Sequence, residues 1–327
     1  MRKPGAALAA LLWLGGPALA FDPSSPMFQA PLEPLVGPDA PLKPKPGEPQ
    51  GDLAFGAYQR GYYLTALREA ERRLTTDAKD AAAMTLVGEI YHDGLALPRD
   101  DKEAANWWRL GAERGDPQAA YEYGVALVSG NGVAADKVAA RAEFAQAAAK
   151  GNLNAIYNLG VLALQGVGDE RPDFAAAAGY FRRAAEAGDG NSAYSYGVLL
   201  REGKGVFLDT DKAAYWLKRA ADAGIIAGQV EYAIMLFNGV GVTKDEAGAA
   251  HLFRLAASHR NPIAQNRLAH LYITGRGVPK DVVRAALWNG LAKAAGLKDD
   301  KLDAAIGTLT AEQLKQVTAL ARQEAEF

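Results

Sequence analysis

Residues 193–224 run AYSYGVLLREGKGVFLDTDKAAYWLKRAADAG, and this stretch decides the fold. Small and apolar residues recur at helical spacing on both sides of a break at Gly203-Lys204-Gly205. Glycine accepts left-handed backbone angles at a helix end, and Asp209 suits the N-cap of a following helix. The stretch therefore predicts two short helices joined by a tight loop.

The same pattern recurs along most of the chain. A glycine returns at intervals of 36, 36, 37, 36 and 36 residues, at Gly94, Gly130, Gly166, Gly203, Gly239 and Gly275. An aspartate follows at the same intervals, at Asp100, Asp136, Asp173, Asp209, Asp245 and Asp281. Because neither helix of a pair can bury its apolar stripe alone, successive pairs must stack. The sequence predicts an all-α solenoid of six antiparallel helix pairs.

The repeat resembles the Sel-like repeat, a relative of the tetratricopeptide repeat. Its pattern is A-x-x-x-[LY]-G-x-x-x-x-x-G-x-G-V-x-x-D-x-x-x-A-x-x-[WYF]-x-x-x-A-A-x-x-G, which residues 193–224 match most fully. The first repeat departs from it with Ala96 at the second loop glycine, and the last two have Ala233 and Ala269 at the helix glycine. The resemblance covers about 80–296 and implies a right-handed α-solenoid of six repeats with terminal capping helices.

The sequence divides into five expected segments. Residues 1–20 are expected to form a cleaved signal peptide, because Arg2 and Lys3 precede an apolar run and Ala18-Leu19-Ala20 fits a cleavage site after Ala20. Residues 21–51 hold nine of the 16 prolines and predict a flexible spacer. Residues 52–79 predict a capping helix pair, 80–296 the six repeats, and 297–327 capping helices. The apolar positions expected in the first pair are Tyr58, Tyr62, Leu67 and Ala70, and in the last helix, expected to start at Thr310, they are Leu314, Val317, Leu320 and Ala321. We therefore expect a periplasmic or secreted protein.

Composition excludes several classes of function. The chain has 36 Lys and Arg against 38 Asp and Glu, which argues against a nucleic-acid partner. It has no cysteine, so a thiolate site, a cysteine nucleophile and a lipid-modified cysteine anchor are excluded. No later apolar stretch is long enough to span a membrane. We expect a monomer that binds a protein or peptide partner in the envelope.

The first helices of the repeats carry the candidate binding residues. In a solenoid of helix pairs these helices are expected to line a concave groove, and positions four and three residues apart share one face. The candidates there are the tyrosines and valines of successive repeats together with charged and aromatic side chains: Tyr121, Tyr157, Tyr194, Val125, Val161, Val198, Arg201, Phe237, Arg267 and His270. The tyrosines either line the groove or pack between adjacent repeats.

No catalytic or metal-binding constellation stands out. Glu89 and His92 share a helix face, but zinc needs a third protein ligand and no other histidine is near in sequence. We therefore expect no catalytic residue, no metal and no cofactor, and a protein that is not an enzyme. The resemblance implies an exported bacterial scaffold, of a kind tied to envelope signalling, surface polysaccharide control or host contact. The alternative is a cell-wall-ligand or β-lactam-interacting family member, which the lack of cysteine and of a nucleophile motif disfavours.

Overall fold

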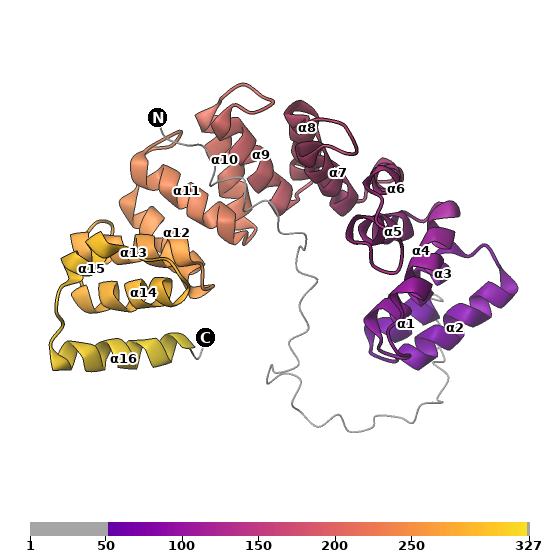
Figure 1. Cartoon of the computed structure of the whole chain (residues 1–327), viewed down its shortest axis with the longest axis horizontal. Coiled ribbons are helices and arrows are strands. Elements are labelled where there is room, and N and C mark those ends of the chain that lie inside the picture. The colour runs from indigo at the N-terminus through magenta and orange to yellow at the C-terminus, as the bar shows by residue number, and fades with distance from the viewer. Residues whose placement is uncertain (1–51, 326–327) are drawn as a thin grey trace, which may run out of the picture. The chain divides into compact units, whose positions relative to one another are not determined.

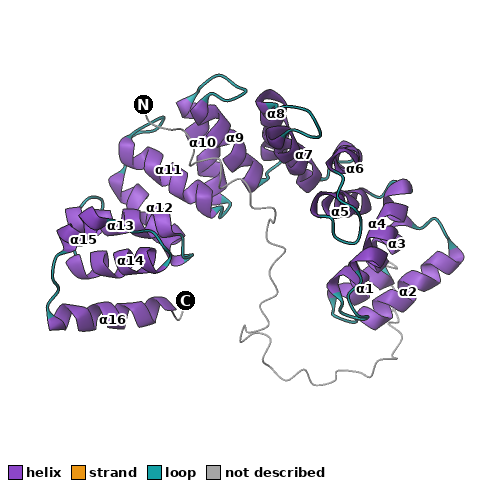
Figure 2. Ribbon diagram, viewed as in Figure 1, coloured by secondary structure: helices purple, strands orange, loops and turns teal. Residues whose placement is uncertain are grey.

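The computed structural model describes residues 52–325, so the predicted signal peptide and proline-rich spacer lie outside the described residues. Within that range the chain forms sixteen α-helices and no strand (Figure 1, Figure 2). It divides into two compact parts between Asn152 and Leu153. The all-helical architecture confirms the predicted fold class.

The N-terminal part contains six helices, and consecutive helices from α1 to α6 pack against each other. They are α1 (Leu53–Gln59), α2 (Tyr63–Thr76), α3 (Ala81–Asp93), α4 (Asp101–Glu113), α5 (Pro117–Ser129) and α6 (Lys137–Ala149). The C-terminal part contains ten: α7 (Leu153–Gln165), α8 (Phe174–Glu186), α9 (Gly190–Glu202), α10 (Thr210–Asp222), α11 (Ile226–Asn238), α12 (Glu246–Ser258), α13 (Pro262–Thr274), α14 (Val282–Ala294), α15 (Asp300–Ile306) and α16 (Ala311–Ala325). The helices α3 to α14 form the six predicted pairs.

The recurring aspartate starts the second helix of each repeat and ties it to the first. In the fourth repeat the Asp209 side chain accepts a hydrogen bond from the amide of Lys212, while its own amide donates to the carbonyl of Leu200 at 3.0 Å. The N-cap bond satisfies an amide that the helix leaves free. The same residue caps the second helix in all six repeats. One residue therefore closes the loop through its backbone amide and starts the next helix through its side chain.

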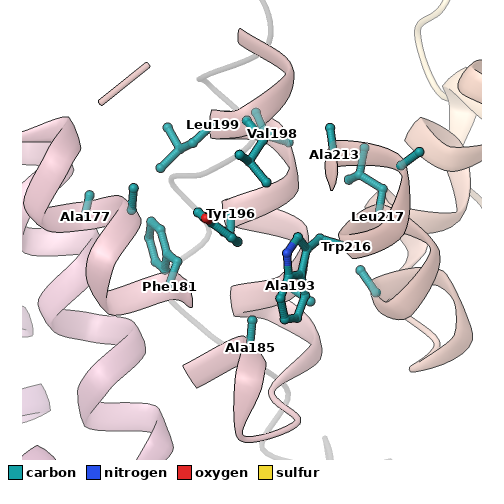
Figure 3. Close-up of a cluster of buried hydrophobic side chains, with 14 of the residues drawn as sticks. Ala177, Phe181, Ala185, Ala193, Tyr196, Val198, Leu199, Ala213, Trp216 and Leu217 are labelled. Carbon is teal, nitrogen blue, oxygen red and sulfur yellow. The ribbon is translucent and has the colours of Figure 1, made fainter. Parts of the chain in front are cut away.

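Small residues on the first helix let the two helices of a repeat approach closely. A Cβ added to Gly160 on α7 would lie 2.6 Å from the ring of Phe181 on α8. Phe181 is fully buried, and its ring fills the space that the glycine leaves. Figure 3 shows Phe181 beside Tyr196 and Trp216 in a core shared by α8, α9 and α10. This core is therefore shared between neighbouring repeats.

Successive repeats also meet through the loop. Gly205 has φ +70°, and a Cβ there would lie 2.2 Å from the carbonyl carbon and oxygen of Phe174, the first residue of α8 in the preceding repeat. Only glycine permits both the left-handed backbone and this contact between main chains. The second loop glycine thus joins one repeat to the repeat before it.

Two helices precede the repeats and two follow them. Arg73 on α2 binds Asp80 at 2.7 Å and Asp52 at 2.5 Å, which links the N-caps of α1 and α3. Tyr62, expected among the apolar positions, is 39% exposed at the start of α2. The capping role of α1, α2, α15 and α16 stays a prediction.

The last helix begins where its sequence predicts. The Thr310 hydroxyl accepts from the amide of Gln313 at 3.2 Å, and the Gln313 side chain accepts from the amide of Thr310 at 2.9 Å. This reciprocal pair is a capping box at the start of α16. Leu314, expected in the apolar stripe of this helix, is instead exposed, while Val317 and Leu320 pack against the core.

Candidate functional site

The first helices of neighbouring repeats lie close enough to share a surface. In the C-terminal part, Arg201 on α9 forms an ion pair with Glu231 on α11. Further along, side chains from α11 and α13 line one pocket. We use the name first-helix surface for four recurring positions on the first helices, each of which forms a column through the repeats. In the last two repeats these positions hold Val230, Glu231, Ile234 and Phe237 on α11, and Asn266, Arg267, His270 and Ile273 on α13. The two parts of the chain each carry a section of it.

The three candidate tyrosines are half-buried on the first helices of their repeats. The Tyr157 ring lies 5.5 Å from that of Phe181, and the Tyr121 ring lies 6.0 Å from that of Phe144, each on the second helix of its own repeat. Burial, together with the Asp189 carboxylate at the start of α9, raises the pKa of Tyr157. Each of these two rings therefore packs in its own repeat, and the Tyr157 hydroxyl also lies in the electrostatic field of Asp189, which caps the first helix of the next repeat.

Tyr194 lies in a more charged setting. Burial, with the Glu231 carboxylate of the following repeat, raises the pKa of Tyr194 to about 12. The hydroxyl is therefore protonated near neutral pH and can donate a hydrogen bond. A partly exposed tyrosine offers apolar area and a polar tip together, which suits a contact surface.

The candidate valines differ in their exposure. Val125 is half-buried on α5, whereas Val161 is 7% exposed and Val198 is 2% exposed, and both belong to the core shared by α8, α9 and α10. In this column, the half-buried side chains of Val125, Ile234 and His270 are therefore the ones that a partner can reach.

Three of the candidates meet in one pocket between α11 and α13. Phe237, Arg267 and His270 line it, and the pocket has a volume of about 320 Å³. Ile234, Asn238, Phe253 and Leu271 complete its wall. The pocket combines an apolar interior with a cationic side chain, Arg267, that is exposed.

His270 is held in place by a carboxylate beyond the repeats. Its Nε2 lies 2.8 Å from Oδ2 of Asp299, which also accepts from Asn266 at 3.1 Å. The Asp299 Oδ1 accepts from the amide of Leu302 at the start of α15. The bonds from His270, Asn266 and that amide hold the pKa of Asp299 well below its usual range. Asp299 therefore stays charged and fixes the histidine at the edge of the pocket.

The sequence did not indicate an acidic pair in the N-terminal part. Burial, with the charge of Asp93 and then Asp116, raises the pKa of Glu89 on α3 to about 7. Burial, with the charge of Glu89, raises the pKa of Glu122 on α5 to about 7, although a hydrogen bond from Gln118 opposes this. Both carboxyls therefore change charge near neutral pH. The available signal in the sequence was an acidic residue at a position that is apolar in the neighbouring repeat: Glu89 corresponds to Val125, and Glu122 corresponds to Leu86.

His92, predicted to share a helix face with Glu89, contacts two residues of α4. Its Nδ1 lies 2.9 Å from Oδ1 of Asp101, and its ring lies tilted against that of Trp108 with 5.3 Å between the ring centroids. Among the described residues no group of three or more His, Cys, Asp and Glu side chains is placed to hold a metal ion. No helix of residues 52–325 has both the length and the apolar character that a membrane span requires.

A second surface feature was also missed, in the loop of the fourth repeat. Phe207 is 96% exposed, and Leu208 beside it is 64% exposed. Small, polar or proline residues fill the same two positions in most other repeats. The loop borders a hollow of about 700 Å³ that Tyr196 and Lys212 also line. In the sequence, two bulky apolar residues at these positions are the feature that distinguishes this loop from those of the other repeats.

Comparison with known proteins identifies the fold. The model of the Sel1 repeat matches six consecutive segments, 81–116, 117–152, 153–189, 190–225, 226–261 and 262–297. The chain belongs to the Sel1 repeat family. This confirms the predicted resemblance, and each matched segment holds one helix pair from α3 to α14.

Two solved structures are similar to this chain to different degrees. A Sel1 repeat protein from Oxalobacter formigenes is 25% identical, with a TM-score of 0.64, and the match covers 73% of this chain and 94% of that one. A protective antigen of uropathogenic Escherichia coli that displays an SLR fold is 22% identical, with a TM-score of 0.43, and the match covers 84% of this chain and 86% of that one. Sel1 repeat proteins generally act as protein-interaction scaffolds and are typically not enzymes.

Proposed function

We propose that this Sel1 repeat protein is an exported scaffold that holds a protein or peptide partner on its first-helix surface. One observation carries the proposal: neighbouring first helices place aromatic and charged side chains side by side, as with Arg201 and Glu231 or Phe237 and Arg267. A partner lying across them would contact several repeats at once. Repeat surfaces of this kind suit extended ligands because each repeat adds a similar contact.

The proposed location is the bacterial envelope or the outside of the cell. It rests on residues 1–20, where two basic residues, a short apolar run and small residues at the cleavage site occur in the order of a secretory signal. The partner would then be an envelope protein, and its capture would regulate envelope signalling or surface polysaccharide. Mass spectrometry of the protein from a periplasmic or culture fraction should give a mature N-terminus at Phe21.

Cross-linking in the native envelope tests the proposal. Tagged protein would be compared with a variant carrying Tyr121, Tyr157 and Tyr194 each changed to Ala. The matched control is Tyr215→Ala, because Tyr215 is an exposed tyrosine on a second helix. A specific partner that is lost from the triple variant and retained by the control supports the proposal.

The fold must be intact for that comparison, since the tyrosine rings pack on Phe144 and Phe181. Circular dichroism and thermal melting check this. Where the alanine variant melts early, Tyr→Phe changes keep the packing and remove only the hydroxyl groups. A partner retained equally by the triple variant and the control would contradict the proposed surface.

A further inference from the structure

The pocket between α11 and α13 differs from the equivalent place one repeat earlier. Phe237 and Arg267 occupy the positions that Arg201 and Glu231 hold between α9 and α11. In the earlier pair of helices the two charges meet in an ion pair. A phenylalanine and an arginine cannot form such a pair, and here the two side chains line a pocket and the arginine has no carboxylate partner within the described residues.

The interior of the pocket is apolar and large enough for one bulky side chain. Ile234, Phe237, Phe253 and Leu271 form most of its wall. Its volume of about 320 Å³ is roughly ten times the share of one water molecule in the liquid, so a phenylalanine or leucine side chain has room. Burying such a side chain contributes favourably because it removes apolar surface from water.

The rim of the pocket offers a free positive charge. Arg267 is exposed and has no hydrogen bond or ion pair within residues 52–325. The nearby Arg276 is engaged, since it lies over the Phe237 ring and binds Glu246 at 2.5 Å. The nearby carboxylate, Asp299, already accepts from His270 and Asn266. The group that remains to be neutralised at the pocket is therefore a guanidinium.

We propose that this pocket binds a polypeptide segment in which a bulky apolar side chain stands next to an acidic side chain. The apolar side chain enters between Ile234 and Phe237, and the carboxylate pairs with Arg267. A guanidinium presents its donors in a planar fork that matches both oxygens of a carboxylate. The inference rests on the proposed scaffold function and specifies which partner sequence the fifth and sixth repeats recognise.

Fluorescence polarisation with labelled Gly-Ser peptides tests the chemistry on the full chain. The probe carries Phe-Glu at its centre, and its two controls carry Phe-Gln and Ala-Glu. We expect the Phe-Glu peptide to bind about three- to tenfold more tightly than either control. Raising the salt concentration should reduce the difference between Glu and Gln, since ions screen an exposed pair.

Variants of the protein assign the binding to this pocket. Arg267→Ala should weaken the Phe-Glu peptide by about three- to tenfold and leave the Phe-Gln peptide unchanged. Arg267→Glu should prefer a Phe-Lys peptide. Asn238→Trp places a large ring at the mouth of the pocket from an exposed position and should block both peptides. Arg171→Ala, which removes an exposed arginine of a distant loop, should change nothing.

Three results would overturn the inference. The first is no binding of the Phe-Glu peptide, and the second is binding that Arg267→Ala and Asn238→Trp both leave unchanged. The third is binding only of a further control, a Gly-Ser peptide that ends in Phe with a free terminal carboxylate, because the carboxylate that pairs with Arg267 would then not belong to a side chain.

The failure of this inference is separable from that of the scaffold function. If the native chain and its Asn238→Trp variant capture the same envelope partner while the peptides do not bind, the pocket proposal fails and the scaffold function stands. If the Phe-Glu peptide binds with the expected variant pattern but the native chain captures no partner, the pocket proposal stands and the scaffold function fails.

Discussion

Gly205→Ala tests how tightly successive repeats are joined. The added Cβ would lie 2.2 Å from the carbonyl carbon and oxygen of Phe174 and 2.5 Å from the amide nitrogen of Ala175. All three are backbone atoms, so no side chain can rotate away. Ordinary contacts of a Cβ lie at 3.4–4 Å, so the loop of the fourth repeat and the start of α8 must move apart by more than about 1 Å.

Two costs add at this position. Holding an L-residue at φ +70° costs about 1–2 kcal/mol. Forcing an extra methyl group into packed structure costs about 1–3 kcal/mol. The expected loss in the free energy of unfolding is therefore about 2–5 kcal/mol, which is a large fraction of the stability of an ordinary domain.

Gly224→Ala separates the two costs. Gly224 has φ +79°, but a Cβ there would meet nothing within 4 Å, so only the backbone cost of about 1–2 kcal/mol applies. Urea unfolding followed by helical circular dichroism gives both values. Hydrogen exchange should show the excess loss of protection in α8 and α9. Equal destabilisation by the two substitutions would refute the close approach of the two main chains.

Three further predictions concern charge and helix capping. Burial lets Glu89 and Glu122 keep their protons to about pH 7, whereas the unfolded chain loses them near 4.5, so the free energy of unfolding should fall as the pH rises between about 4.5 and 7. Changing both to Gln should flatten that fall in a series of thermal melts at different pH, and a pH profile identical to that of the native chain would contradict it. Asp136→Ala should cost about 1 kcal/mol because α6 loses its cap to Val138 and Ala139, while Asp136→Asn, which can still accept, should cost little in urea unfolding. Thr310→Ala should increase hydrogen exchange in the first turn of α16 alone, since it removes half of a capping box.

The fold was predictable because its determinants are local and repeat. A glycine that ends one helix and an aspartate that starts the next act within a few residues, so their spacing alone predicted the helix pairs. The structure adds why these residue types are needed, as at Gly160, whose missing Cβ admits the ring of Phe181. The expected burial failed at Tyr62, which is the N-cap of α2, and at Leu314 on α16, where no following repeat within the described residues covers the apolar stripe.

The candidate site was predictable only in outline. Helical spacing placed Phe237, Arg267 and His270 on one face, and the structure brings these three together around a pocket. The same spacing could not show that Val161 and Val198 are buried in the core. A small rotation of a helix about its axis is enough to bury a position at the edge of its exposed face, and the sequence does not fix that rotation. Nor could it show that Glu231 binds Arg201, which lies 30 residues away and belongs to another helix.

Departures from the repeat are therefore more informative about binding than the repeat itself. Residues shared by all six repeats, such as the capping aspartates, account for the fold and would be required whatever the partner. The column after the tyrosines instead holds Leu86, Glu122, Asn158, Ser195, Glu231 and Arg267, and its chemistry changes from repeat to repeat. Where its charge is matched by a neighbour, as at Glu231, an ion pair forms. Where the neighbour is Phe237, a pocket and an unpaired guanidinium remain, and for that reason we propose this place as the one that selects the partner.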